Sequence, residues 1–332
     1  MYKSLFIFIV VAIFFNGCSH KKLYEPNDKN IHNDKNQLKK IKNKLDKQEV
    51  YFYDISKQTS KTNKFKRDKG YNYLSLTDNT MITKNEKSIK LNNKQKLSFD
   101  KEIVSVSKRK NLIAIVFIDN SIAIYDIVNN QMIFKEQKKH IFIYNSQAAR
   151  PIFLNNTVLF PTLDGKIAVV DIKNRRLLRD LIVATTGLLK NITFLQLIDE
   201  TLVTSTNNNI LSFGEAKLNI KEFEIVSTAI DADFIYIATI DGQVIKMTKA
   251  LDIVAKKKFN FANFLSINVF DHNIFLVEAQ GFLIKISDDF KKSSVYHVDI
   301  PNDKDIAKLE KKYFVKSSFR VLGNLLLYGA GH

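Results

Sequence analysis

The sequence predicts an all-β protein, a β-propeller built from four-stranded antiparallel blades. From Val50 onward, short runs of β-branched and aromatic residues alternate with turn pairs such as Asp-Gly, Asp-Asn and Asn-Asn, which are strand and hairpin signals. These turns recur at a regular interval, and the two ends of this region match two halves of one repeat. Proline is scarce, with four in the chain, and no long helical period is evident.

Two segments show the repeat most clearly, NLIAIVFIDNSIAIYDIVNNQMIF from Asn111 and NTVLFPTLDGKIAVVDIKNRRLLR from Asn156. Each reads as strand, tight turn, strand, polar turn, strand, and a strand of five or six residues fills the interval between the turns. A seven-residue offset links the first turn to the second in six units: Asp119-Asn120 to Asp126, Asp164-Gly165 to Asp171, Asp241-Gly242 to Thr248, Gln280-Gly281 to Ser287, Asn208-Asn209 to Glu215 and Asp78-Asn79 to Asn85.

A further strand precedes the first turn of each unit, which makes four strands per unit. The first turns begin at residues 78, 119, 164, 208, 241 and 280, so successive units are 41, 45, 44, 33 and 39 residues apart. Four antiparallel strands at this spacing are typical of a propeller blade. The clearest candidates for the preceding strand are Ile103–Ser107, Thr193–Leu197, Val226–Ile230 and Ser266–Phe270.

The two ends of the domain predict how the ring closes. Asn324–His332 matches a second strand, and Val50–Ile55 (VYFYDI) matches the third-strand pattern of Ile122–Ile127 (IAIYDI). Pairing the two would complete one composite blade and remove free sheet edges, which otherwise invite aggregation. We therefore expect seven blades in a ring closed by N- and C-terminal strands. Eight or six blades remain open, because residues 301–312 are irregular.

The first residues predict export and lipid attachment. Lys3 precedes an apolar run of eleven residues, Leu5–Phe15, which is shorter than the roughly 20 residues that a membrane-spanning helix needs and has the length of a signal peptide core. Gly17 then precedes Cys18, the only cysteine. This segment resembles the lipobox of bacterial lipoproteins, although Phe15 and Asn16 depart from its usual pattern. The resemblance implies cleavage before Cys18, which becomes lipidated.

This resemblance also implies a location. Ser19 follows the cysteine, and by the sorting rule of enteric lipoproteins a residue other than aspartate there indicates the outer membrane. We expect the protein to be lipid-anchored at the outer membrane, facing the periplasm. The predicted organisation is a signal peptide at 1–17, a lipidated Cys18 with a flexible basic tether at 18–49, and the β-propeller at 50–332.

The net charge of +17 is concentrated near the N-terminus. Residues 21–69 hold fifteen Lys or Arg and seven Asp or Glu, a contribution of +8, with few apolar residues before Val50. Such a composition is typical of a solvated tether. The remaining charge is scattered, so we expect no nucleic-acid partner, and export also removes the usual one.

The strands resemble the PQQ-like repeat family, whose units run as strand, Asp-Gly, strand, turn and strand, most clearly over residues 156–179. Quinoprotein dehydrogenases of this fold use a stacking tryptophan, a calcium site and an aspartate base. This chain has no tryptophan, so the resemblance supports the fold and not the cofactor. We expect no cofactor, no metal and no catalytic residue, and hence no enzyme activity.

The remaining chemical groups have simple structural interpretations. Asp119, Asp164 and Asp241, like Asp126 and Asp171, are interpreted as turn formers. The six histidines, at positions 20, 32, 140, 272, 297 and 332, show no metal-ligand spacing. Four aromatic residues lie between expected strands and are either binding anchors on a propeller face or core residues: Tyr144, Phe261, Phe264 and Tyr313.

These features predict a monomeric, membrane-anchored scaffold that binds envelope proteins. Lipidated propellers of PQQ-like repeats include the BamB family, which supports outer-membrane protein assembly, and the architecture here is similar. The alternative is a binding module for a small molecule, peptidoglycan or a host surface, and a quinoprotein-type enzyme ranks last. Cys18 is the one residue to which the sequence assigns a definite chemical role.

Overall fold

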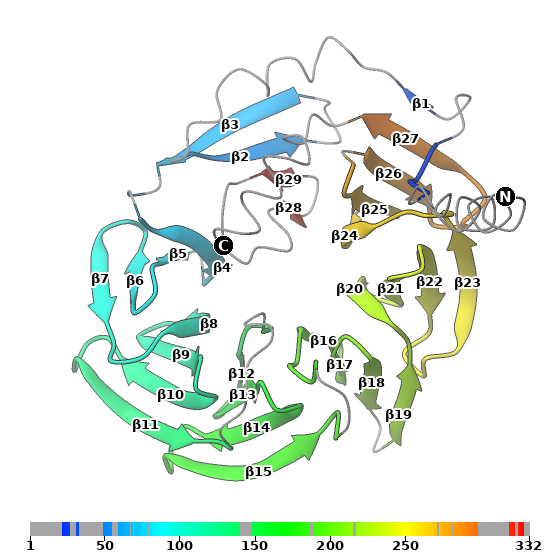
Figure 1. Cartoon of the computed structure of the whole chain (residues 1–332). Helices are drawn as coiled ribbons and strands as arrows, with labels where there is room; N and C mark the ends of the chain where they lie inside the picture. Colours follow the sequence, from blue (N-terminus) through cyan, green and yellow to red (C-terminus); the bar gives the residue numbers. More distant parts are fainter. Residues whose placement is uncertain are drawn as a thin grey trace, which may run out of the picture.

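A computed structural model describes residues 22–26, 31–32, 49–54, 59–66, 68, 70–78, 80–139, 148–185, 189–214, 217–270, 272–280, 282–297, 319–322 and 325–328. The strands in these ranges form seven sheets, six with four strands and one with five. Figure 1 shows them placed around a common centre, with the first strand of a sheet innermost and the last at the periphery. The prediction of an all-β chain with four-stranded antiparallel sheets is confirmed.

Five sheets each consist of four strands that are consecutive in the sequence. The β4 sheet contains β4 (Asn72–Thr77), β5 (Thr80–Lys84), β6 (Ser88–Leu91) and β7 (Gln95–Ser98). The β8 sheet contains β8 (Ile103–Arg109), β9 (Leu112–Phe117), β10 (Ser121–Asp126) and β11 (Gln131–Gln137). The β12 sheet contains β12 (Ile152–Leu154), β13 (Thr157–Pro161), β14 (Lys166–Asp171) and β15 (Arg176–Ile182).

The next two sheets repeat the pattern. The β16 sheet contains β16 (Phe194–Ile198), β17 (Thr201–Ser205), β18 (Asn209–Gly214) and β19 (Lys217–Glu222). The β20 sheet contains β20 (Ile225–Ile230), β21 (Ile235–Thr239), β22 (Gln243–Met247) and β23 (Ile253–Lys258). The strands expected at 103–107, 193–197, 226–230 and 266–270 therefore lie within β8, β16, β20 and β24, to within one or two residues at their ends.

The two remaining sheets combine distant parts of the chain. The β24 sheet contains β24 (Phe264–Phe270), β25 (Asn273–Glu278), β26 (Phe282–Ser287) and β27 (Ser293–His297), and β1 (Ile31–His32) joins its outer edge in parallel with β27. The composite sheet has the order β28 (Phe319–Leu322), β29 (Leu325–Tyr328), β2 (Glu49–Asp54) and β3 (Thr59–Lys66).

In the composite sheet, β29 pairs antiparallel with β2, from Tyr51 opposite Tyr328 to Asp54 opposite Leu325. These are the two segments that the sequence indicates as second and third strands of one unit. Figure 1 shows this sheet between the β24 and β4 sheets. A strand from each end of the domain is thus hydrogen-bonded to the other, although more than 260 residues of chain separate them.

The core lies between neighbouring sheets, because the middle strands are apolar on both sides. β9 and β13 are buried along almost their whole length, whereas the outer strands β19 and β23 alternate between exposed and partly buried residues. One core cluster joins the β8 and β12 sheets through side chains such as Val116, Ile124 and Phe160. A strand covered on both faces gains from apolar residues at every position, which explains the continuous runs IAIVF and IAVV.

One repeat unit was predicted in the wrong register. Asp78 lies in the turn between β4 and β5, the first hairpin of its sheet, and Asn79 lies outside the described residues. The second hairpin contains Asn85, whose side-chain oxygen accepts from the Ser88 amide at 2.9 Å. Because β5 has only five residues, successive hairpins here also lie seven residues apart. The offset alone cannot tell one hairpin from the next.

The segment before Val50 also departs from the prediction of a solvated tether. Tyr24 is only 7% exposed and belongs to the core cluster of the β20 and β24 sheets. The pairing of β1 with β27 places a second part of this segment on the propeller. Apart from residues 22–26 and 31–32, the range 1–48, with Cys18, lies outside the described residues. Within the described ranges, no helix has the length and apolar character needed to cross a membrane.

Two predicted turn glycines have a steric role in addition to their positive φ. Gly165 (φ +85°) and Gly242 (φ +81°) each place their backbone against the next connection, so that a Cβ would overlap the backbone carbonyl oxygen of Ala184 or of Phe259 respectively. Gly242 also accepts a hydrogen bond from the Phe259 amide at 2.8 Å. The second hairpin of a sheet is thereby packed against the loop that leads to the next sheet.

The substitution Gly242→Ala should therefore cost more stability than the same change at Gly70. Both residues have positive φ, where alanine costs about 1–2 kcal/mol, but nothing lies within 4 Å of a Cβ at Gly70. Overpacking against the Phe259 carbonyl adds about 1–3 kcal/mol. Urea unfolding of the two variants measures the difference, and equal losses would contradict the packing of this turn.

Candidate functional site

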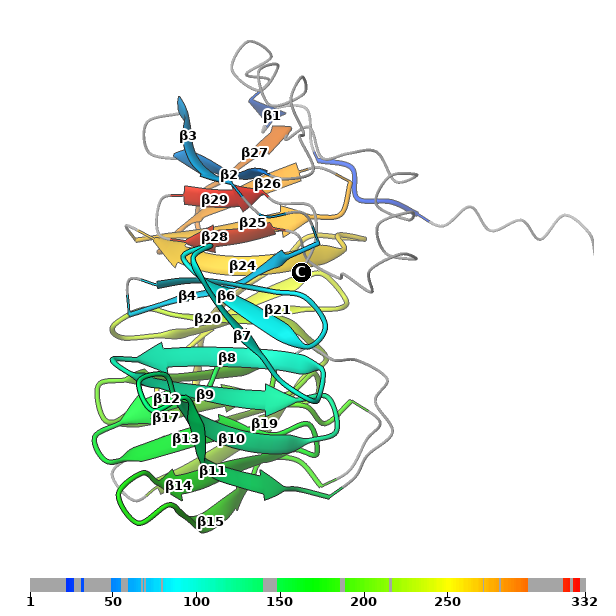
Figure 2. The same cartoon turned by 90° about the vertical axis from the view of Figure 1, so that its left-hand side faces the viewer.

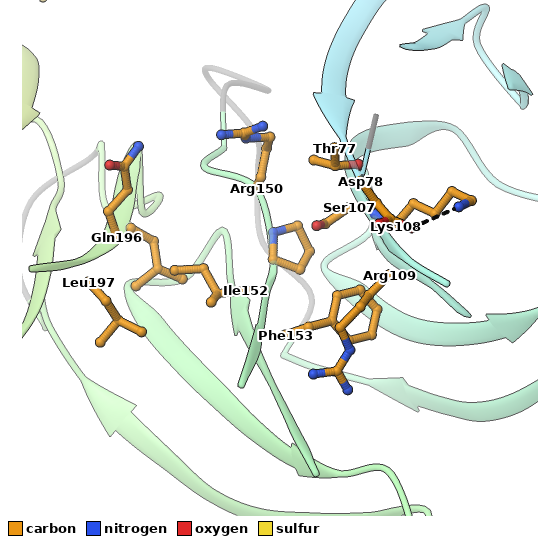
Figure 3. Close-up of a pocket in the computed structure, with 12 residues that line it drawn as sticks. Thr77, Asp78, Ser107, Lys108, Arg109, Arg150, Ile152, Phe153, Gln196 and Leu197 are labelled. Carbon is orange, nitrogen blue, oxygen red and sulfur yellow. Dashed lines mark hydrogen bonds and ion pairs between the residues drawn. The ribbon is translucent and has the colours of Figure 1, made fainter. Parts of the chain in front are cut away.

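A cavity of about 550 Å³ opens where the first strands of four successive sheets end. Its lining comes from Thr77–Asp78 after β4, Ser107–Arg109 on β8, Arg150–Phe153 around β12 and Leu195–Leu197 on β16. Figure 3 shows Gln196 and Leu197 on one side and Asp78, Lys108 and Arg109 on the other. We call this end of the sheets, which carries the turns between first and second strands, the cavity face.

The first side of the cavity is held by a turn carboxylate. Asp78 has φ 49° in the β4–β5 turn. Its Oδ2 accepts from the Lys108 ammonium at 3.0 Å and from the Lys110 amide at 2.8 Å, and the Lys108 amide donates to Thr77 Oγ1 at 3.0 Å. The hydrogen bond from Lys108, followed by that from Lys110, holds the pKa of the Asp78 carboxyl below its ordinary value. The β4–β5 turn is thereby fastened to the end of β8.

Arginine side chains give the cavity a basic character. The Arg109 guanidinium lies over the Phe153 ring, 4.8 Å from its centroid, and donates to the backbone carbonyl oxygen of Asn155 at 2.7 Å. Arg150, two residues before β12, is exposed. With Lys108, the lining holds three basic side chains and one carboxylate. A guanidinium stacked on an aromatic ring keeps N–H donors available for carboxylates.

The lining also contains apolar side chains. Ile152 lies between Gln196 and the basic groups in Figure 3, and Pro151, Phe153, Leu195 and Leu197 complete the apolar part. A surface that combines arginines with aliphatic and aromatic side chains has the composition of protein-binding hot spots. Its four segments are spread over residues 77–197, so no local sequence pattern could have identified it. The spacing of the repeat places first-strand ends together, but it does not indicate which of them carry arginine.

Of the aspartates interpreted as turn formers, Asp119, Asp164 and Asp241 lie in turns, and Asp126 and Asp171 end β10 and β14 directly before one. Asp119 accepts from the Ser121 amide at 3.1 Å and pairs with Lys101. Asp241 accepts from Gln243 Nε2 at 2.7 Å and pairs with Lys258 at 2.6 Å. The three remaining predicted aspartates behave alike: Asp164 pairs with Lys166, Asp126 accepts from the Val128 amide, and Asp171 accepts from the Asn174 amide.

Asn120 has a role that the turn pattern did not reveal. It is fully buried with φ 65°. Its Oδ1 accepts from the Leu163 amide at 2.8 Å, and its Nδ2 donates to Asp164 Oδ1 at 3.1 Å. One asparagine therefore links the second hairpin of the β8 sheet to that of the β12 sheet.

A second polar cluster is buried between the β20 and β24 sheets. Lys246 is 5% exposed, pairs with Asp288 and lies 4.0 Å from the centroid of the Phe234 ring. The hydroxyl of Tyr236, which is fully buried, donates to Asp231 at 2.7 Å. Burial, followed by the bond to Asp231, raises the pKa of Tyr236. Each group has a charged or aromatic partner within the fold, so the cluster is interpreted as a tie between sheets.

The other sequence candidates are dispersed. Phe264 begins β24 and is 2% exposed, so it is a core residue and not a loop contact. Phe261 is exposed with φ 64°, whereas Tyr144, Tyr313 and the side chain of His297 lie outside what the structure describes. Among the described residues, no group of three or more His, Cys, Asp or Glu could hold a metal ion.

Comparison with known proteins gives two kinds of similarity. No family model matches the chain. The plasminogen-binding protein PgbB of Helicobacter pylori strain J99 is 32% identical over 196 residues, which is 58% of this chain and 36% of PgbB. PgbB from a second strain of that species is also 32% identical, over 197 residues and with the same coverage of both chains. The matched region is thus about a third of the relatives' length.

Solved structures share the fold at low sequence identity. BamB from Moraxella catarrhalis superposes with a TM-score of 0.57 at 12% identity, over 68% of this chain and 76% of BamB. The C-terminal WD40 domain of Sif2 superposes with a TM-score of 0.57 at 14% identity, over 70% of this chain and 73% of the Sif2 domain. At such identities the likeness concerns the fold alone, and it supports the assignment as a β-propeller.

The substitution Lys108→Met should raise the pKa of the Asp78 carboxyl, because it removes the first cause of its lowering. The value should stay below normal, since the Lys110 amide still donates. NMR titration of side-chain carboxyl carbons measures the shift. Lys110→Met, which removes a charge but keeps that amide, is the matched control and should have a smaller effect. An unchanged pKa in Lys108→Met would contradict the described geometry.

Proposed function

We propose that this chain is a lipid-anchored, non-catalytic β-propeller that binds a protein ligand on its cavity face. The observation that carries the proposal is the 32% identity to PgbB, a protein named for binding another protein. The cavity supplies a place for such contact, because it combines three basic groups with apolar side chains from the β12 and β16 sheets. Protein binding through an exposed face needs no reactive group.

We propose further that the seven sheets are seven blades and that the composite sheet closes the ring. The pairing of β29 with β2 supports this closure, since it joins strands from opposite ends of the domain. A closed ring leaves only short strand edges at the periphery. It also holds β4, β8, β12 and β16 at fixed positions, and a cavity formed by four sheets depends on that.

The ligand segment that suits the cavity is acidic with apolar residues beside its carboxylates. Arg109, held against Phe153, and Arg150 supply the positive charge that attracts those carboxylates. Lys108 is already paired with Asp78, so it contributes less to an incoming ligand. The apolar side chains of Ile152 and Leu197 would be covered by the ligand, which adds to affinity.

Plasminogen is the first protein ligand to test, because it is the one named for the relatives at 32% identity. It falls under the alternative drawn from the sequence, a module that binds a host surface. A role in outer-membrane assembly, the leading prediction from the sequence, has only a shared fold with BamB in its support. That role stays a prediction.

The lipid at Cys18 and the outer-membrane location are part of this proposal, and a host ligand requires the outer side of that membrane and not the periplasmic side expected from the sequence. They rest on the signal-like segment Leu5–Phe15 and on Cys18 as the only cysteine. Several acyl chains on one cysteine give stable anchoring where a single chain gives marginal binding. A propeller confined to a membrane surface presents its binding face at a raised local concentration.

The double substitution Arg109→Ala with Arg150→Ala should weaken plasminogen binding by the mature chain at least tenfold. Charge-assisted hydrogen bonds contribute about 1.5–3 kcal/mol each, and about 1.4 kcal/mol corresponds to a factor of ten. Surface plasmon resonance on immobilised plasminogen measures the affinity.

The control is Lys96→Ala with Lys256→Ala, which removes the same charge from exposed positions on β7 and β23. It should leave the affinity within twofold. Equal losses in both variants would show that net charge, and not the cavity, carries the binding. No binding by the unaltered chain would contradict plasminogen as the ligand.

A further inference from the structure

The five residues Lys22–Pro26 lie on the propeller and are fastened there by Tyr24. The Tyr24 ring packs edge-on against Phe259 at 6.2 Å and Phe282 at 5.7 Å between centroids, and Phe259 in turn packs against Phe264. Such edge-to-face pairs add specific geometry to the burial of the ring. Tyr24 therefore inserts into the aromatic core shared by the β20 and β24 sheets.

Polar contacts fix the same segment. Gln280 Nε2 donates to the backbone carbonyl oxygen of Tyr24 at 3.2 Å. The same amide lies beside Glu278, which is fully buried. Burial, together with the Glu278 carboxylate, raises the pKa of Tyr24 to about 12. The Lys22 ammonium lies 5.6 Å from the centroid of the Phe261 ring. We call Lys22–Pro26 with these contacts the latch.

The latch lies at the end of the sheets opposite the cavity. Its partners belong to the connection between β23 and β24, which includes Phe259 and Phe261, and to the end of the β25–β26 hairpin at Gln280. In an antiparallel sheet, the turn from second to third strand lies at the other end from the turn between first and second strands. Figure 2, an edge-on view, shows the blue segment Lys22–Pro26 on the side of the ring opposite to the end of β8. We call this end the anchor face.

Chain length then limits how far a lipid on Cys18 can lie from the anchor face. Three residues, Ser19–Lys21, separate Cys18 from Lys22, and the four Cα–Cα steps between them span at most about 14 Å. A tether of about thirty free residues would allow any orientation of the propeller. A linker of three residues that ends at the latch does not, because it is too short to let any face but the anchor face reach the bilayer.

The surface around the latch suits a lipid surface. Leu23 is 55% exposed, and so is Phe261, while Ile240 is 61% exposed in the β21–β22 turn that packs against the Phe259–Ala262 connection. Lys22 adds a positive charge beside them. Exposed apolar side chains next to a basic residue favour the interface of an anionic bilayer.

We infer that the latch turns the anchor face toward the membrane, where Leu23, Ile240 and Phe261 contact the lipid surface, and turns the cavity face away from it. This inference rests on the proposed lipid at Cys18. It deepens the proposed function, since it leaves the cavity free for a protein ligand that approaches from the compartment beyond the membrane.

The test compares two single-cysteine labels in the lipidated chain reconstituted into vesicles of phosphatidylethanolamine and phosphatidylglycerol. Asn260→Cys lies on the anchor face, and Ala232→Cys lies at the opposite end of the same sheet; both positions are exposed. Lipidation occupies Cys18, so each introduced thiol is labelled alone. Quenching by lipids with spin-labelled head groups should be at least threefold greater at position 260. Equal quenching would overturn the inference.

The latch itself is tested with Tyr24→Ala and Tyr24→Phe. Tyr24→Ala should make the quenching at positions 260 and 232 equal, because release of Lys22–Pro26 lengthens the chain between the lipid on Cys18 and the first residue held on the propeller. Tyr24→Phe keeps the ring contacts and should preserve the difference. Mass spectrometry of the N-terminal peptide measures lipidation in every sample. An acylated chain with no preferred orientation would contradict the inference alone, whereas a chain without lipid would contradict the proposed anchor.

Contact of the anchor face with lipid is tested by two double variants that each remove two exposed apolar side chains. Ile240→Ser with Phe261→Ser should lower quenching at position 260 at least twofold in the acylated chain. Ile253→Ser with Val254→Ser removes apolar residues of comparable exposure (49% and 51%) from β23 and should leave quenching unchanged. The same loss in both variants, or in neither, would contradict a specific contact at the anchor face.

Discussion

The pairing of β29 with β2 is the constraint on which the arrangement of the other sheets depends. It holds Leu325–Tyr328 against Tyr51–Asp54 in the sheet that lies between the β24 and β4 sheets. Propeller sheets are stabilised chiefly by packing on their neighbours, as the shared cores of the β8 and β12 sheets and of the β20 and β24 sheets illustrate. If this pair opened, the β4 and β24 sheets would each lose a neighbour. The proposed closure thus makes the stability of the ring depend on both ends of the domain.

Within that ring the two ends of the sheets have different chemistry. The cavity face gathers arginine and apolar side chains from the β8, β12 and β16 sheets, whereas the anchor face carries the hairpins between second and third strands and the latch at Tyr24. The close approach at Gly242 explains part of this difference, because it packs a hairpin against the Phe259 connection and leaves Phe261 exposed. Binding and anchoring can therefore occupy opposite faces of one rigid ring.

Local patterns in the sequence predicted most of the fold and little of the site. The Asp164-Gly165 turn and the strand VYFYDI were identified because hairpin chemistry and strand alternation act over a few residues. The register failed at Asp78, where a short strand makes successive hairpins equally spaced. The docking of Tyr24 and the burial of Lys246 could not be predicted, since each depends on partners from other sheets. The same reason hid the cavity, whose arginines belong to two different sheets.

Disulfide cross-linking across the composite sheet tests the ring most directly. Phe52 and Leu327 are register partners, and residues directly opposite each other have Cβ atoms about 4.5–5.5 Å apart. In a Cys18→Ser background, Phe52→Cys with Leu327→Cys should form an intramolecular disulfide in high yield in the folded chain. Phe52→Cys with Leu325→Cys, two residues out of register, should cross-link poorly. Failure of the first pair, or equal yields for both, would contradict a ring joined by the two ends of its chain.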